Sequence, residues 1–225
     1  MLDLGAFFTS LVGRIVNMST YKWAANWIFP TVKNIIWRIP QNKRTIFLTI
    51  DDGPSPQGTR EILQILSELK IRATFFLSGI MIYRNRRYLD ALNFEGHQLG
   101  NHGFFHHPYM FIPTKMMQKE IELTDKLIFK QFKRRSILFR PPHGIFGPRL
   151  ENVLNRLNKK LIFWSLMSND FKWDPQKVLN HLKKNLAPGD IVVFHDSSNH
   201  IKTTLQVLPE FLEYCLQNEF EFSVL

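Results

Sequence analysis

The sequence contains a single cysteine, Cys215, which excludes an intrachain disulfide and any dependence of the fold on an oxidising compartment. No apolar run reaches the roughly 20 residues that a membrane-spanning helix needs. A signal peptide is also not indicated, because Asp3 stands where such peptides carry positive charge and no small-residue cleavage site follows. We therefore expect a protein that is cytoplasmic or peripheral to a membrane.

The sequence also lacks zinc-finger spacing and the glycine-aromatic motifs of RNA-binding domains. It has 29 Lys and Arg against 19 Asp and Glu, a net charge of +10, which attracts anionic partners such as nucleic acid, anionic lipid or acidic glycan. The basic residues are scattered, and the densest group, at 130–135, lies where positive charge suits the end of a predicted helix. We expect no nucleic-acid partner, and a solvated basic surface explains the charge equally well.

The first forty residues form a lead-in that is rich in tryptophan. Trp23, Trp27 and Trp37 stand among aliphatic residues, and basic residues such as Arg14 and Lys22 interrupt the segment. Two interpretations are open. The segment lies on a membrane surface as an amphipathic helix, which gives a peripheral membrane contact, or its aromatic rings cover the core of the following domain. We place the main domain at 41–225.

From about residue 44, short β-branched or aromatic runs alternate with longer helical stretches. The predicted strands are Thr45–Ile50, Ala73–Leu77, His97–Asn101, Ser136–Arg140, Leu161–Leu166, Ile191–Phe194 and Glu221–Leu225. The predicted helices cover 57–70, 83–94, 114–133, 148–158, 174–186 and 203–217. This alternation indicates parallel βαβ units. About seven such units predict a single α/β domain with a closed or nearly closed barrel.

Titratable residues follow most of the predicted strands, at the ends where α/β barrels carry their active sites. They are Asp51 and Asp52 after the first strand, His102 and His106 after the third, Arg140 at the end of the fourth, Asp170 past the fifth and His195 at the end of the sixth. Because the carboxyl ends of parallel strands meet at one edge, these side chains are expected to gather in one site.

Two adjacent carboxylates, Asp51 and Asp52, repel each other unless a cation or a base lies nearby. Successive side chains of a strand point to opposite faces, so the two do not share one role by simple alternation. The following Gly53-Pro54 turn can reorient them. Taken alone, Asp-Asp-Gly-Pro is more typical of an ordinary turn.

The histidines after the third strand have the spacing of a metal site. His102 and His106 are four residues apart, so on one helical turn both imidazoles point the same way. The spacing of His107 turns it away. Two His and one Asp suit Zn²⁺, Co²⁺ or another divalent first-row ion. An isolated His pair is more often structural, and the crowding of three histidines favours the metal site.

Two further strand ends carry candidate residues. Arg140 opens a rigid exit in which Pro141 and Pro142 fix the backbone and Gly144 permits an unusual turn. An Arg at a barrel mouth suggests a partner carboxylate, and a purely structural role is the alternative. His195 ends the apolar run Ile191–Phe194, where a structural histidine is also an alternative.

Together, the segments around these residues resemble the polysaccharide deacetylase family, carbohydrate esterases similar to nodulation chitooligosaccharide deacetylases and peptidoglycan deacetylases. The similarity runs from about Thr45 to the C-terminus in the family's order, and it includes Ala73-Thr74-Phe75-Phe76 and Gly96-His97-Gln98-Leu99-Gly100. Each motif alone is weakly specific, and the ordered set is highly specific. The resemblance implies a distorted (β/α) barrel and a metal-dependent hydrolase that removes N-acetyl or similar acyl groups from the amino sugars of a glycan.

The resemblance also implies catalytic roles for four residues. Asp51 would be the general base and Arg140 would hold it in place. His195 would be the general acid, and Asp170 would lie beside it. An amide nitrogen cannot leave as an anion, so the reaction needs such an acid to protonate the leaving amine.

The metal ligands implied by the resemblance are Asp52, His102 and His106. The metal would be Zn²⁺, with Co²⁺ or another first-row ion as alternatives. It would polarise the acyl carbonyl and activate a water molecule. The backbone N–H of His143 would help to bind the oxyanion.

The sequence departs from the family's pattern beside the expected substrate groove. Met167 stands where members often have Asp, and Phe171 where they often have Trp. The run Gly103-Phe104-Phe105 replaces a more polar run. These changes affect the binding of the acylated glycan rather than the chemistry.

Two other functions compete with this interpretation. The first is a deformylase or deacetylase of a lipid-linked sugar, which the basic charge and the aromatic lead-in would suit. The second is a non-catalytic glycan-binding module on the same fold, which would show the loss of Asp51, a metal ligand or His195; none of these is lost. Nothing in the sequence speaks to the oligomeric state.

Overall fold

The computed structural model describes residues 35–110, 112–196 and 201–225, and both interpretations of the segment around Trp23 and Trp27 lie outside these ranges. Within them, nine strands form one sheet in the order β1-β6-β5-β4-β3-β2-β8-β7, with β9 paired to β2. The strands are β1 Ile35–Ile36, β2 Thr45–Asp51, β3 Thr74–Leu77, β4 Gln98–Asn101, β5 Leu138–Phe139, β6 Lys160–Ile162, β7 Leu166–Met167, β8 Ile191–His195 and β9 Glu221–Ser223. Strands β2 to β9 pair in parallel.

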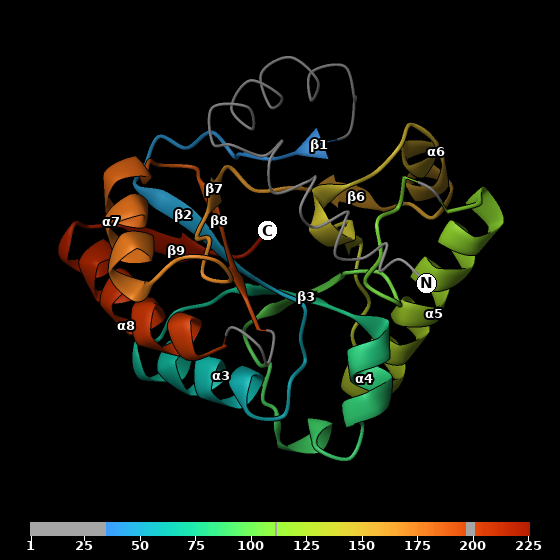
Figure 1. The fold of residues 1–225 in the computed structure, drawn as a ribbon, viewed down its shortest axis with the longest axis horizontal. Helices are drawn as coiled ribbons and strands as arrows, with labels where there is room; N and C mark the ends of the chain where they lie inside the picture. Colours follow the sequence, from blue (N-terminus) through green and yellow to red (C-terminus); the bar gives the residue numbers. More distant parts are fainter. Residues whose placement is uncertain (1–34, 111, 197–200) are drawn as a thin grey trace, which may run out of the picture. The chain divides into compact units, whose positions relative to one another are not determined.

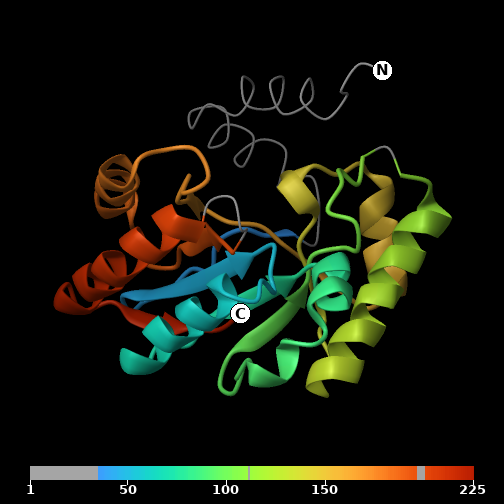
Figure 2. The ribbon, with the colours of Figure 1, turned by 60° about the horizontal axis from the view of Figure 1, so that its bottom comes forward.

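Helices surround this sheet in two groups. The helices are α3 Gly58–Glu68, α4 Gly79–Asn85, α5 Thr114–Phe132, α6 Arg149–Arg156, α7 Pro175–Asn185 and α8 Ile201–Gln217. In Figures 1 and 2, α3, α7 and α8 lie on one side of the strands, and α4, α5 and α6 lie on the other. Strands β2, β3, β4, β5, β7 and β8 are each followed by a helix before the next strand, as expected for βαβ units.

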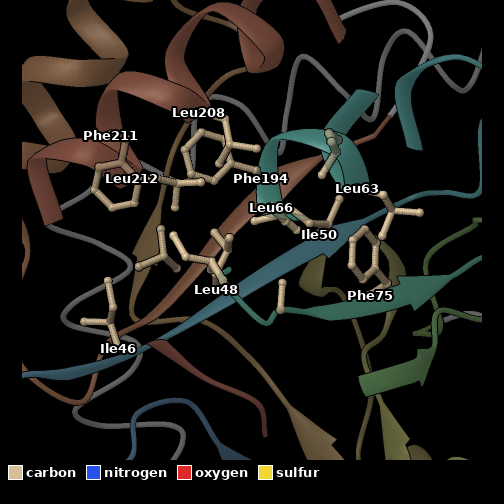
Figure 3. Packing of buried hydrophobic residues seen from close by; sticks show 14 of the residues in the cluster. Ile46, Leu48, Ile50, Leu63, Leu66, Phe75, Phe194, Leu208, Phe211 and Leu212 are labelled. Carbon is tan, nitrogen blue, oxygen red and sulfur yellow. The ribbon is translucent and has the colours of Figure 1, made fainter. Parts of the chain in front are cut away.

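The core forms where β2 and β8 are covered by α3 and α8. All of β2 after Thr45 is buried, and β8 is buried up to Phe194. Figure 3 shows Ile46, Leu48 and Ile50 of β2 facing side chains of α3 and α8. Continuous apolar runs of this kind suit strands that are covered on both faces. A buried apolar core therefore lies beneath the strand ends that carry Asp51 and His195.

The sheet curls until its two ends approach each other. Strand β6, which pairs with β5, is second from one end of the strand order, and β7, which pairs with β8, is last at the other end. Only Phe163–Ser165 connects β6 to β7, so the two ends lie within about 15 Å there. The distorted (β/α) barrel in a single main domain is confirmed. The single strand predicted at Leu161–Leu166 is wrong, because the chain crosses between the sheet ends in that segment.

Residues 36–39 connect the same two ends of the sheet. The Ile36 carbonyl accepts from Phe163 N–H at 2.7 Å, and Ile39 N–H donates to the Gly189 carbonyl at 3.0 Å. Arg38 pairs with Asp190 in an isolated antiparallel bridge. The sequence did not predict that these residues hydrogen-bond to both ends of the sheet. The domain boundary at residue 40 stays a prediction.

The predicted helix at 83–94 is wrong. Helix α4 begins at Gly79, directly after β3, and a short 3-10 helix follows at Leu89–Ala91. Backbone N–H groups of Gly79 and Ile80 donate to carbonyls of the loop after β4, so the helix start depends on a segment distant in sequence. No helix in the described ranges is both long enough and apolar enough to cross a membrane.

Candidate active site

The sheet brings the predicted site residues to one edge. Asp51 and His195 are register partners on β2 and β8. Asn101 and Phe139 are partners on β4 and β5, which places His102 and Arg140, the next residues along each strand, beside each other. This confirms that the polar residues gather at the carboxyl ends of the strands.

Asp51 is buried, with 2% of its surface exposed, and one of its oxygens is occupied. Its Oδ1 accepts from Arg140 Nη1 at 2.6 Å. Its Oδ2 lies 4.0 Å from His102 Nε2, on the side of the histidines. The carboxylate therefore has one oxygen fixed by an ion pair and the other turned toward the centre of the site.

Arg140 is fully buried and its orientation is determined by several groups. Nη1 also donates to Thr49 Oγ1 at 2.8 Å, and Nη2 donates to the Phe163 carbonyl at 2.9 Å. The guanidinium lies 4.1 Å from the centre of the Phe76 ring. A buried cation is stable only with such partners. The carboxylate partner that the sequence suggested is Asp51.

Asp52 leaves the strand in a different direction from Asp51 because its backbone is left-handed, with φ of 77°. The segment after it is held by Asp196, whose carboxylate accepts from Ser55 Oγ at 2.5 Å and from Thr59 Oγ1. A Cβ atom at Gly53 would lie 2.6 Å from this carboxylate, so the turn requires glycine there. The Gly53-Pro54 turn thus separates the two carboxylates, as its sequence suggested.

His102 has a defined tautomer. Its Nδ1 lies 2.8 Å from the Arg140 carbonyl oxygen, which can only accept, so Nδ1 carries the proton. In the neutral ring, Nε2 then has its lone pair free, and it faces Asp52 Oδ1 at 3.4 Å. The hydrogen bond from Nδ1 to the Arg140 carbonyl is the kind of contact that typically orients a metal-binding histidine.

His106 reaches the same carboxylate, but the predicted helical turn is wrong. Residues 102–108 form an irregular loop, in which Gly103 has φ of 74° and His106 has φ of 56°. These left-handed residues redirect the chain so that His106 Nε2 lies 2.8 Å from Asp52 Oδ1. The spacing of four residues brings the two imidazoles together by a different geometry from the helix.

The neighbouring His107 does not join this cluster. Its Nε2 lies 2.9 Å from Glu120 Oε1, a buried carboxylate of α5. Tyr109 O–H donates to the other oxygen of Glu120 at 3.3 Å. Glu120 thereby holds the far side of the histidine loop, a role that the sequence did not indicate.

Asp52, His102 and His106 suit a divalent cation. One donor atom from each residue lies within 4.8 Å of the others. Asp52 Oδ1 is buried and makes no hydrogen bond of good geometry among the described groups. Burial opposes ionisation of Asp52, but His102 and His106 hold its pKa well below its usual range. With His102 neutral, an acceptor faces an acceptor, and a cation between them resolves this conflict.

His195 forms a pair with Asp170. Asp170 Oδ1 accepts from His195 Nδ1 at 2.7 Å, and its Oδ2 accepts from His195 N–H at 2.8 Å and from Thr204 Oγ1 at 2.7 Å. Burial alone lowers the pKa of His195, but Asp170, with Asp52 and Asp51, raises it to about 9. Asp170 is itself buried, and His195 and Thr204 lower its pKa. His195 is therefore protonated at neutral pH.

Thr204, a residue of α8, was not singled out from the sequence. Its hydroxyl contacts both Asp170 and the His195 carbonyl, at 2.7 and 3.1 Å. A threonine near the start of a helix ordinarily indicates capping or a turn, so the sequence contains no signal for this role.

His143 and Phe171 flank the centre from two sides. His143 has φ of 59°, and its backbone N–H donates to no acceptor among the described residues. Its ring lies 4.5 Å from the His106 ring, and burial, followed by the charges of His106 and His102, lowers its pKa to about 4. Phe171 packs edge-on against His195 at 5.0 Å and is 37% exposed.

Solved structures share this fold. A peptidoglycan N-acetylglucosamine deacetylase superposes with a TM-score of 0.83 and 23% identity, covering 89% of this chain and 95% of that one. A protein from Bacillus anthracis, described as a CE4 family pseudoenzyme, superposes with a TM-score of 0.77 and 23% identity, covering 84% and 66%. At these identities the similarity concerns the fold.

Sequence comparisons agree with the motifs. A peptidoglycan-N-acetylglucosamine deacetylase of Bacillus cereus is 30% identical over 191 residues, which are 84% of this chain and 89% of that protein. A chitooligosaccharide deacetylase of Azorhizobium caulinodans is 29% identical over 163 residues, covering 71% and 77%. The family model for polysaccharide deacetylase matches residues 38–162. The chain belongs to the polysaccharide deacetylase family.

Proposed function

We propose that this protein is a metal-dependent hydrolase that removes N-acetyl groups from the amino sugars of a glycan. One observation carries the proposal. The Asp52, His102 and His106 donor set lies between a carboxylate with a free oxygen, Asp51, and a histidine with a raised pKa, His195. A hydrolysis that needs both a base and an acid requires groups in these two states.

The metal would be held by Asp52 Oδ1 and by the Nε2 atoms of His102 and His106. A set of one carboxylate and two imidazoles favours Zn²⁺, with Co²⁺ or another first-row ion as alternatives. A divalent cation bound there supplies Lewis-acid chemistry, since it polarises an acyl carbonyl and lowers the pKa of water.

Asp51 would act as the general base. Its Oδ1 is held by Arg140, so Oδ2 is the atom available to accept a proton from the attacking water. The rigid hold on Arg140 fixes this oxygen, because Thr49, Phe163 and Phe76 all contact the guanidinium. Positioning of this kind lowers the barrier to attack on the acyl carbon.

His195 would act as the general acid. Its Nδ1 is bound to Asp170, which leaves the Nε2 proton for the leaving amine. The His143 backbone N–H would donate to the oxyanion of the tetrahedral intermediate, since no described group accepts from it.

The substrate class follows from the relatives. Those at about 30% identity are named for peptidoglycan N-acetylglucosamine and for chitooligosaccharides. Acylated amino-sugar glycans are therefore the proposed substrates. Met167 and Phe171 lie at the end of β7 and against His195, where they would contact the sugar.

The direct test of this chemistry compares Asp51→Asn and His195→Ala with the unmodified protein. We expect acetate release from a chitooligosaccharide, measured with saturating Zn²⁺, to fall by roughly 10²–10⁴-fold in each variant. His181→Ala, a histidine of α7 remote from the site, is the control and should keep the activity. Retained activity in both variants would overturn the assignment of base and acid.

The competing function is a non-catalytic glycan-binding module, as the pseudoenzyme of the same fold illustrates. It predicts that the unmodified protein binds the glycan and Zn²⁺ but releases no acetate. The proposal predicts release, so the same assay separates the two.

A lipid-linked sugar is the second candidate substrate, because Phe105, next to His106, is 59% exposed. An apolar ring beside the site would suit contact with a membrane surface. If the substrate is a lipid-linked sugar, we expect the protein to cosediment with anionic vesicles at low salt and Phe105→Ser to lose this binding. An absence of vesicle binding would eliminate the lipid-linked substrate.

A further inference from the structure

A second cleft, of about 540 Å³, lies far from Asp51 and His195. Its walls are one face of α3, the residues that precede β3, and 91–97, which precede β4. Because β2, β3 and β4 are parallel, this is the amino edge of the sheet, opposite the catalytic edge. The five residues from His97 to His102 correspond to about 16 Å at roughly 3.3 Å per residue. The cleft is therefore separate from the proposed metal site.

The cleft has an excess of unpaired positive charge. Arg60, Lys70 and Arg72 line it, and Glu95 is the single acidic residue in its lining. None of the three cations has an ion pair or a side-chain hydrogen bond with any residue that the structure describes. Arg72 extends along Gly96, where a Cβ atom would lie 3.6 Å from its Nε. These side chains are thus free to bind an anion.

Neutral donors stand among the cations. Arg60, Gln64 and Ser67 recur at helical spacing on the exposed face of α3 and all line the cleft. The Gln64 amide donates one N–H to Glu68 Oε1 at 2.9 Å, which leaves its second N–H for a ligand. Asn93 contributes a second amide from the opposite wall. Charged and neutral donors that converge in one cleft match an anion with several acceptor oxygens.

His97 adds a further neutral donor to the cleft. It lines the cleft and is 9% exposed. Its Nδ1 accepts from Ala73 N–H at 3.2 Å, so the neutral ring carries its proton on Nε2. Burial, and then the charges of Arg134 and Arg72, lower its pKa to about 4, so the ring is neutral. Across the described ranges, Nε2 has no hydrogen-bond partner. Nε2 is not one of the fully enclosed polar atoms, so it is open to the cleft and adds a neutral N–H donor to its lining.

We propose that this cleft binds a phosphate-bearing ligand. Guanidinium groups make paired hydrogen bonds with phosphate oxygens, and Lys adds a point charge. The volume falls in the range of about 300–1,000 Å³ that small-ligand sites occupy. A small soluble phosphate and a phosphodiester polymer share this group, and the cleft lies open to either while a glycan occupies the other edge.

The test is calorimetric titration of the full-length protein at low salt with two probes, pyrophosphate and poly(glycerol phosphate). The double variant Arg60→Gln/Arg72→Gln should weaken binding by about tenfold or more, since each guanidinium makes charge-assisted bonds. The matched control is Arg86→Gln/Arg87→Gln, which removes the same charge after α4, outside the cleft. This control should leave the affinity unchanged.

A second variant, Gln64→Glu, adds a negative charge on the exposed face of α3 without removing a cation, and it should also weaken binding. Thermal unfolding of each variant checks that the fold is intact. Binding of pyrophosphate identifies a small phosphate as sufficient, and binding of the polymer alone identifies the phosphodiester chain. The absence of binding by either probe, or equal weakening in the Arg86/Arg87 control, would overturn the proposal. We expect acetate release to be unchanged in every cleft variant. A loss of acetate release would therefore concern the proposed hydrolase activity and not the phosphate site.

Discussion

At the scale of single residues, the Asp170 carboxylate accepts from the His195 ring, the His195 backbone and Thr204. The raised pKa of His195, about 9, means that its proton is present at neutral pH and is lost as the pH rises through that value. The pair therefore sets the alkaline limit of any reaction in which His195 donates a proton.

We predict that Asp170→Asn moves this alkaline limit to lower pH. The substitution removes the largest influence that raises the pKa of His195, whereas the effect of burial, which lowers it, stays. The dependence of kcat on pH, measured at saturating Zn²⁺, should show the descending limb shifted toward acid relative to the unmodified protein. An unchanged limb together with reduced activity would show that Asp170 acts only on the fold.

Thr204 offers a milder perturbation of the same pair. Thr204→Val keeps the shape but removes one of the donors to Asp170, so we predict a decrease in kcat of up to about tenfold, consistent with the loss of one hydrogen bond to a charged group. Thr203→Val, its neighbour, is the matched control. Equal effects of both substitutions would assign the loss to helix α8 in general.

The residues that the sequence predicted share a property that Thr204 lacks. Asp51, His102 and Arg140 belong to short motifs directly after strands, so parallel topology alone brings them together. Thr204 and Phe76 act through contacts with residues far away in the sequence. No local pattern records such contacts, and they become visible only in the folded chain.

At the scale of elements, the loop after β4 determines where His102 and His106 point. Gly103 is left-handed, and a Cβ atom there would lie 2.9 Å from the Tyr109 hydroxyl. Tyr109 is in turn held by Glu120 of α5. The loop is therefore fixed by packing against α5 rather than by a helix of its own.

We predict that Gly103→Ala destabilises the protein by about 1–3 kcal/mol and weakens metal binding, because it adds backbone strain and a close contact. Gly147→Ala is the control, since Gly147 has no left-handed φ and its nearest neighbour would lie 3.6 Å away. Thermal unfolding with and without Zn²⁺ measures both effects. Equal unfolding temperatures for the two variants would contradict this account of the loop.

Most strands and helices follow from their apolar patterns, and the exceptions have a common cause. Strands β2, β3 and β8 are buried runs that periodicity identifies. The division of Leu161–Leu166 into β6 and β7, and the start of α4 at Gly79, depend on neighbours across the sheet. Contacts with distant segments, rather than local residue preferences, therefore determine where these elements begin and end.

At the scale of the whole described domain, the two edges of the curled sheet have different chemistry. The carboxyl edge carries the carboxylates and histidines of the proposed active site. The amino edge carries the basic cleft around His97. The barrel itself was predictable from alternating strands and helices, and its near closure by residues 36–39 was not, because that contact joins segments about 150 residues apart.

The most direct test of the central claim is a titration of acetate release against Zn²⁺ in protein stripped of metal. The account predicts that activity rises to a plateau at one equivalent per chain. His106→Ala should require on the order of 100-fold more Zn²⁺ or fail to recover. The matched control His181→Ala should follow the unmodified protein, because His181 lies on α7, outside the loop that carries His102 and His106. Full activity without metal, or equal losses in the two histidine variants, would contradict the claim that Asp52, His102 and His106 bind the metal on which hydrolysis depends.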